Sequence, residues 1–223
     1  MFRTLQFIIP IKNKMKKFIP FIAAASVAAV MVSCSGNPKF VGQWASTAPY
    51  SMARDLPVSI ADAQLTLDFG IGEESTSTGP VTLSSVIDLT QPVEADTTFS
   101  QAYEVSVTAN STVTGTWLLA DDDDDVVLSF DMSTLSVSVD TDGVAFSQNL
   151  LTGAQQPVLD SLTTVTAQRW QSLLTAAVKR QLADFAELDD VEVSDNGNIL
   201  TFEIKTDAKH DRKLTFNRLL QAK

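Results

Sequence analysis

Apolar and polar side chains alternate along much of the chain between about residue 40 and residue 148, as they do in strands with one buried face. Leu65, Leu67 and Phe69 alternate with Thr66 and Asp68, for example. The same period recurs within residues 81–85, 103–107, 113–117, 128–130, 135–139 and 144–146. Turn-forming segments separate these runs, and DTDG at 140–143 predicts a hairpin turn. The pattern predicts an antiparallel meander, in a sandwich or a barrel.

The period changes to that of a helix at about residues 157–188, where turn signals disappear. Its apolar residues fall near one helical face: Trp170, Leu174, Ala177, Phe185 and Leu188. We expect one long helix or two shorter ones there, and short strands again from Val191 to about Leu219. The predicted fold class is therefore mainly β, with about eight or nine strands and a long helical segment inserted before the last strands.

The N-terminal pattern is that of a secretory signal. Lys16 and Lys17 precede an apolar run at 18–32, which is short for a bilayer-spanning helix. We expect Met15 to be the true start and residues 1–33 to be removed as a signal peptide. An ordinary cleaved signal and an uncleaved membrane helix remain the alternatives.

The sequence MVSC ends this run and leads into the one cysteine of the chain, Cys34. It resembles the lipobox of bacterial lipoproteins, although Met31 stands where that family usually has leucine. The resemblance implies that Cys34 is acylated and becomes the new N-terminus. We therefore expect a lipidated polar tether at 34–39 and a folded domain at 40–220.

The negative net charge of the chain limits the classes of macromolecule that it can bind. The whole chain has a formal net charge of −11, and residues 1–33 hold five basic and no acidic residues, so the remaining 190 residues carry −16. Between Arg54 and Arg169 there are 18 acidic residues and no lysine or arginine. Such a surface repels the phosphates of nucleic acids, and we expect no nucleic-acid partner.

Two Gly-x-Trp elements stand in predicted strands, Gly42 to Trp44 and Gly115 to Trp117. The chain resembles the lipocalins and their calycin relatives, and more narrowly the lipocalin-like lipoproteins of the Bacteroidetes. In that family the first strand opens with Gly-x-Trp, and the indole closes the barrel floor. The resemblance implies a calycin-like barrel over about residues 40–219, with an arginine of the last strand, here Arg218, covering the indole. An unrelated β-sandwich with both tryptophans in its core is the alternative.

Five consecutive aspartates, Asp121 to Asp125, lie between two apolar, strand-like runs. Asp121, Asp123 and Asp125 would begin an EF-hand-like loop, but Val126 stands at its glycine position and Met132 at its bidentate glutamate position. The flanks instead predict a hairpin with a solvated acidic tip. A loose cation site and a recognition surface are the alternatives.

Catalytic patterns are sparse in this sequence. His210 is the one histidine, and it lies in a charged segment. There is no Gly-x-Ser-x-Gly elbow, no phosphate-binding glycine loop, and no ligand set for zinc. We therefore expect no enzyme, no cofactor and no metal.

The sequence predicts a non-catalytic lipoprotein of the cell envelope, held to the membrane by an N-terminal lipid anchor. We expect it on the outer membrane, facing the periplasm, because the residues after Cys34 lack the acidic stretch that surface-exposed relatives often carry. Its expected role is binding of a small apolar or amphipathic ligand in the barrel. The alternative is a structural or interaction protein with a side-chain-filled barrel or sandwich.

Overall fold

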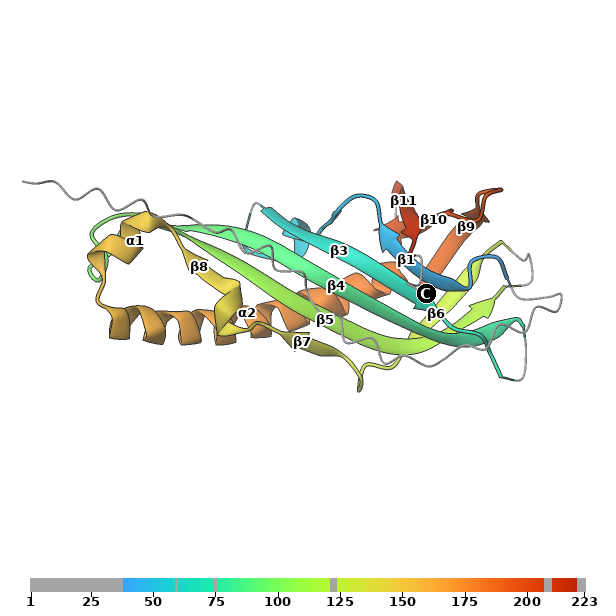
Figure 1. Cartoon of the computed structure of the whole chain (residues 1–223), viewed down its shortest axis with the longest axis horizontal. Coiled ribbons are helices and arrows are strands. Elements are labelled where there is room, and N and C mark those ends of the chain that lie inside the picture. The colour runs from blue at the N-terminus through green and yellow to red at the C-terminus, as the bar shows by residue number, and fades with distance from the viewer. Residues whose placement is uncertain (1–37, 59, 74–75, 121–123, 207–209, 220–223) are drawn as a thin grey trace, which may run out of the picture. The chain divides into compact units, whose positions relative to one another are not determined.

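The computed structural model describes residues 38–58, 60–73, 76–120, 124–206 and 210–219 (Figure 1). The predicted signal peptide and Cys34 lie outside the described residues. Residues Gly36–Lys223 form one compact unit, and the description that follows concerns this unit alone. None of the helices in the described part of the chain has both the length and the apolar character needed to cross a bilayer.

The elements follow each other in the order β-rich, helical, β-rich. The first part consists of β1 (Gly42–Ser46), β2 (Tyr50–Ser51), the 3₁₀ turn η1 (Ala53–Asp55), β3 (Ile60–Phe69), β4 (Thr78–Val93), β5 (Tyr103–Leu119), β6 (Val126–Phe130), β7 (Ser136–Ser138), the 3₁₀ turn η2 (Thr141–Gly143) and β8 (Val144–Phe146). The helices α1 (Gln148–Gly153) and α2 (Gln156–Asp184) follow, and the chain continues with β9 (Glu187–Val193), β10 (Ile199–Thr206) and β11 (His210–Arg218).

Eight of the described strands close an antiparallel barrel in the order β1-β11-β10-β9-β6-β5-β4-β3, and β3 pairs back with β1. The prediction of a mainly β meander that closes into a barrel, with a helix inserted before the last strands, is therefore confirmed. Among the described residues, each of these eight strands therefore pairs with two neighbours.

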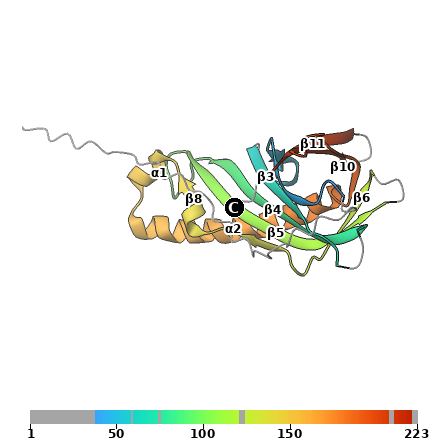
Figure 2. The same cartoon turned by 45° about the vertical axis from the view of Figure 1, so that its right-hand side comes forward.

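Strands β4 and β5 are 16 and 17 residues long and extend beyond the barrel. There the sheet is completed by the short strands β2, β7 and β8, and α2 packs along β5, β7 and β8 (Figures 1 and 2). The C-terminal half of α2 buries Trp170, Leu174 and Leu182. The helix therefore covers the face that the long strands would otherwise expose.

Two sequence predictions differ from the structure. The segment DTDG does not form a hairpin turn, because β7 and β8 do not pair with each other but both pair with β5. The 3₁₀ turn η2 lies between these two short strands, which follow each other along the edge of β5. The helix ends at Asp184 rather than at about residue 188, because Leu188 pairs with Val126 in the barrel wall. Leu188 is buried as predicted, but from a strand.

The middle of the barrel is filled by side chains. The inward positions alternate along each strand, as the sequence pattern predicted. Fully buried aromatic and aliphatic residues from four strands lie there: Leu65, Leu67, Phe69, Val126, Leu200, Phe202, Ile204 and Phe216. Phe202 and Phe216 stack with ring centroids 5.1 Å apart.

Candidate functional site at the floor of the barrel

The floor of the barrel is built around Trp44 on β1, which is fully buried. The indole Nε1 donates a hydrogen bond to the carbonyl of Phe40 at 2.6 Å, and the guanidinium of Arg218 lies 4.2 Å from the centroid of its ring. This is the pair that the lipocalin resemblance implies. Arg218 comes from the last strand, opposite Trp44 in the β1–β11 register.

Arg218 is held by three backbone carbonyls. Its guanidinium donates to Gly197, Val41 and Lys39 at 2.6, 3.1 and 2.8 Å. Partial burial lowers the pKa of this arginine, but a guanidinium stays charged at any physiological pH. Arg218 therefore ties the start of β1 to the β9–β10 turn and to the indole.

Gly42 is required by both its conformation and its surroundings. Its φ is +130°, which L side chains rarely adopt, and a Cβ there would lie 2.7 Å from Arg218 Nη1. The first Gly-x-Trp element thus gives the arginine room beside the chain.

The second Gly-x-Trp sequence, Gly115 to Trp117, has a different structural role. A Cβ on Gly115 would lie 2.8 Å from the Cα of Phe130, so the glycine allows β6 to approach β5 closely. Trp117 donates from Nε1 to the carbonyl of Gly70 at 2.9 Å and packs edge-on against Phe40, with ring centroids 5.1 Å apart. Phe40 makes the same kind of contact with Phe69, also at 5.1 Å.

The structure therefore brings the two Gly-x-Trp elements together through Phe40, whereas Arg218 contacts only the first indole. Sequence reasoning did not single out Phe40. Its signal was the alternation Phe40, Gly42, Trp44, which continues the inward face of β1 toward the N-terminus.

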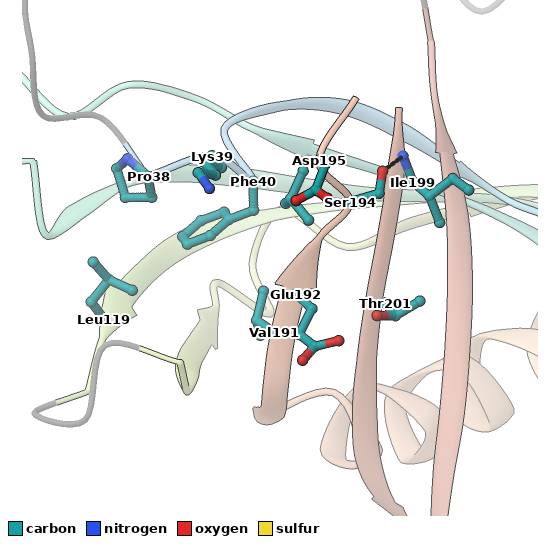
Figure 3. A pocket seen from close by; sticks show the side chains of 11 residues that line it. Pro38, Lys39, Phe40, Leu119, Val191, Glu192, Ser194, Asp195, Ile199 and Thr201 are labelled. Carbon is teal, nitrogen blue, oxygen red and sulfur yellow. Dashed lines mark hydrogen bonds between the residues drawn. The ribbon is translucent and has the colours of Figure 1, made fainter. Parts of the chain in front are cut away.

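A hollow of about 800 Å³ opens beside this floor (Figure 3). It is lined by Pro38, Lys39, Phe40, Leu119, Val191, Glu192, Val193, Ser194, Asp195, Ile199 and Thr201, and we call it the floor-end hollow. In Figure 3 the Phe40 ring projects into the space between Leu119 and the side chains of β9.

The hollow exists because β9 continues past its partner. β6 pairs with β9 only at Val126–Leu188 and Val127–Glu187, and Asp190 then takes a positive φ of 52°. Beyond it, the amide of Val191 donates to the carbonyl of Asp124 at 2.7 Å. The last residues of β9 thus form one side of an opening in the barrel wall.

The aspartate run lies next to this opening. Leu119 pairs with Val126, and the amide of Ala120 donates to the carbonyl of Asp125 at 2.9 Å, so the predicted hairpin is present. Asp121 and Asp123 lie outside the described residues. The carboxylate of Asp125 accepts a hydrogen bond from the amide of Asp190 at 3.2 Å, which fixes the base of the hairpin on β9.

Asp125 also belongs to an acidic cluster that the sequence did not reveal. One carboxylate oxygen each of Asp125, Glu187 and Asp189 lie within 4.8 Å of one another. Lys205 Nζ lies 3.3 Å from Glu187 and 3.0 Å from Asp189, and these hydrogen bonds, first that to Asp189, raise the pKa of the lysine. Lys205 thus supplies positive charge beside two of the three carboxylates of this cluster.

The opposite end of the barrel is closed by Tyr50 and the C-terminus of α2. The Tyr50 hydroxyl donates to Asp184 at 2.8 Å, the same carboxylate accepts from Arg54 at 2.9 Å, and the Arg212 guanidinium lies 4.5 Å from the Tyr50 ring centroid. A smaller hollow of about 150 Å³ lies between β11 and the β1–β2 connection. This end is tied together by hydrogen bonds and ion pairs, which leaves the floor end as the better candidate site.

Comparison with protein-family models, with curated proteins and with solved structures gives no match for this chain.

Proposed function

We propose that the chain is a membrane-anchored, non-catalytic lipoprotein of the cell envelope that binds a small apolar or amphipathic ligand. In this proposal Cys34 carries the lipid, the protein faces the periplasm from the outer membrane, and the ligand binds in the floor-end hollow rather than in the middle of the barrel. The lipobox-like sequence supports the anchor. Because side chains fill the middle of the barrel, we place the ligand in the floor-end hollow instead.

One observation carries the binding role. At the floor end a hollow of about 800 Å³ is lined by partly covered apolar side chains and by polar ones, the latter being Lys39, Glu192, Ser194, Asp195 and Thr201. Sites for small ligands are concave, are mostly apolar with a few polar groups, and measure roughly 300–1,000 Å³. The mouths of β-barrels are among their usual places. The size and position of this hollow fit that description, and its mixed polar and apolar lining favours an amphipathic ligand.

Native mass spectrometry of the protein purified from its host tests the binding role. We expect an added mass of a small molecule that is lost on mild collisional activation. Intact-mass analysis of the same sample tests the anchor, with a lipid-modified Cys34 as the expected N-terminus. A ligand-free protein, or an N-terminus at Met1 or Met15, would contradict the respective half of the proposal.

A second candidate function is favoured by a separate observation. Leu151 on α1 and Val158 and Val165 on α2 are between 43 and 58% exposed, far from the floor along the chain and on the helices that flank the long strands. Val158 and Val165 are seven residues apart and therefore lie on one face of α2, and exposed apolar side chains that share a face favour a protein contact. An envelope interaction protein would use this surface, and a ligand-free protein that co-purifies with a stoichiometric partner would favour it.

A further inference from the structure

We propose that a second copy of this chain packs against the solvent-facing side of α2, with the two α2 helices antiparallel. This inference names the partner for the exposed apolar side chains that favour the second candidate function, and it does not depend on a ligand in the hollow. Three features of the helix carry it: its satisfied hydroxyls, its lack of carboxylates, and the order of its larger and smaller side chains.

The side of α2 that faces solvent follows from the helical period. Val158, Val165 and Ser172 succeed each other at intervals of seven residues, which keeps them close to one line along the helix. Trp170 and Leu174 are buried on the opposite side. We call the exposed and half-buried residues around this line the outer face of α2: Val158, Ser161, Leu162, Val165, Gln168, Arg169, Ser172, Thr175 and Ala176.

The hydroxyl groups of the outer face cost little to cover. Those of Ser172 and Thr175 donate hydrogen bonds within the helix, to the carbonyls of Gln168 and Gln171 at 3.2 and 2.7 Å. A hydroxyl that is satisfied in this way keeps its hydrogen bond when water is displaced. Val165, which is 58% exposed, is stabilised when it is covered. The outer face therefore favours a partner surface that is itself largely apolar.

The outer face carries no carboxylate, although the chain is strongly acidic. Residues 34–223 have a formal net charge of −16, and Arg169 is the one charged residue of the outer face. Asp160 precedes Val165 by five residues and therefore lies about 140° round the helix from it. Like charges that meet at a contact repel each other. Two equally acidic copies can thus meet at the outer face without opposed carboxylates.

The order of side chains along the outer face suits an antiparallel copy. With a two-fold axis beside Val165, Val158 lies opposite Ser172 of the partner subunit, because each is seven residues from the axis. A larger side chain then meets a smaller one, as close packing of two helices requires. On one flank, Leu162 lies beside the aliphatic stem of Arg169 of the partner subunit.

Antiparallel pairing also keeps the two barrels apart. α2 packs on β8 near its start and on β10 near its end, so an antiparallel copy has its barrel beyond the opposite end of the helix (Figure 1). In two copies anchored to one membrane, this arrangement requires the helices to lie along the membrane surface. A helix pair about 27 Å long buries less than the roughly 1,200–2,000 Å² of a stable interface, so we expect a weak, reversible dimer.

Sedimentation velocity of the compact unit Gly36–Lys223, from micromolar to millimolar concentration, tests the association. Val165→Glu (V165E) places two carboxylates beside the two-fold axis, and circular dichroism checks that the helix is intact. Val127→Glu (V127E) is the matched control, because Val127 is an exposed valine on the barrel wall outside α2.

We expect the original protein and V127E to dimerise and V165E to associate about tenfold more weakly or not at all, since burying unpaired like charges is costly. Added salt should strengthen the dimer, because it screens the net charge that both copies share. A monomer at every concentration, a V165E dimer as tight as that of the original protein, or a dimer that salt weakens would each overturn the proposal.

Cross-linking tests the position of the two-fold axis. The compact unit has no cysteine, so Val165→Cys introduces a single thiol, and Val127→Cys is the control. A disulfide needs Cα atoms about 4.4–6.8 Å apart, which residues beside the axis can reach. Mild oxidation should link the Val165→Cys protein into dimers much faster than the control. Equal rates for the two variants would contradict the pairing of α2 with α2.

Failure of this proposal is distinguishable from failure of the proposed function. A protein that stays monomeric but retains a small molecule from its host contradicts the dimer and leaves the binding role standing. A monomer that binds a different host protein through the outer face also contradicts it, because the occupant is then not a second copy. A ligand-free dimer that V165E disrupts supports it and contradicts the binding role alone.

Discussion

Arg218 and Arg212 both point inward from β11, and each lies over an aromatic ring at one end of the barrel. Their surroundings differ, however. Arg218 satisfies three backbone carbonyls from two segments far apart in the sequence, whereas the ring of Tyr50 is the one contact that the described residues offer the guanidinium of Arg212. We therefore expect the two arginines to contribute unequally to stability.

We expect Arg218→Met to lower the free energy of unfolding by about 3 kcal/mol, because it removes charge-assisted hydrogen bonds and a cation–π contact together. Arg212→Met should cost roughly 1 kcal/mol or less, since it removes the cation–π contact alone. Urea denaturation of both variants measures the difference. Equal losses would show that the floor is not held by Arg218.

Tyr50 allows a test of the interactions that close the end of the barrel opposite the floor. Burial, followed by its hydrogen bond to Asp184, raises the pKa of its phenol well above the ordinary value. Tyr50→Phe should therefore lower stability by about 1 kcal/mol at neutral pH, because it leaves one lone pair of Asp184 unsatisfied. Tyr103→Phe is the control, since the Tyr103 hydroxyl makes no hydrogen bond to another described residue.

The same pair predicts a pH dependence. The folded-state pKa of Tyr50 is raised, so its contribution is fully present below the unfolded value of about 10 and declines as the pH rises above it. The advantage of the original protein over Y50F should therefore shrink at pH 10–11 in urea melts. A constant difference across this range would contradict the assigned hydrogen bond.

At the scale of elements, the alternation of side chains was enough to predict the strands of the barrel and the inserted helix. It could not predict which strands pair. Residues 136–138 and 144–146 look like two arms of a hairpin, yet both add to the edge of β5, because β5 is long enough to accept them in succession. Leu188 fits the helical period and the strand period alike, and pairing with Val126 decides the outcome.

The aspartate hairpin gives a prediction at this scale. Asp122→Asn, Asp123→Gly and Asp124→Ser together should leave the fold intact, because the bond from Val191 uses the backbone carbonyl of residue 124. Relief of like-charge repulsion should raise the melting temperature slightly at low ionic strength, and salt should erase the gain. Asp125→Ala should instead cost about 1 kcal/mol, since it removes the acceptor for the Asp190 amide.

The effect of calcium on the thermal melt distinguishes a solvated hairpin tip from a cation site. Binding to the native state alone would stabilise the original protein by RT ln(1 + [L]/Kd). We expect millimolar calcium to leave its thermal melt unchanged, because Lys205 already pairs with Glu187 and Asp189. A shift of several degrees that needs the intact aspartates would show that the hairpin is a metal site.

At the scale of the whole molecule, the sequence pointed to the floor through Gly42, Trp44 and Arg218, but not to the hollow beside it. The floor has a short local motif. The hollow is formed by the segment before β1, the end of β5, and the β9–β10 hairpin, which are far apart in the sequence. Its existence depends on where β6 stops pairing with β9, and no local pattern records that.

The central claim is that the floor-end hollow holds a small ligand in the protein as its host makes it. The direct test is to express the original protein, Val193→Glu (V193E) and the control Val127→Glu (V127E) in the host and to quantify by mass spectrometry the small molecules extracted from equal amounts of each. Val193 lines the hollow, whereas Val127 is an exposed valine on the barrel wall that does not line it. We predict about one ligand per chain in the original protein and in V127E, and its loss from V193E, because a carboxylate inside the hollow opposes apolar burial. Equal ligand content in all three proteins, or none in any of them, would contradict the claim.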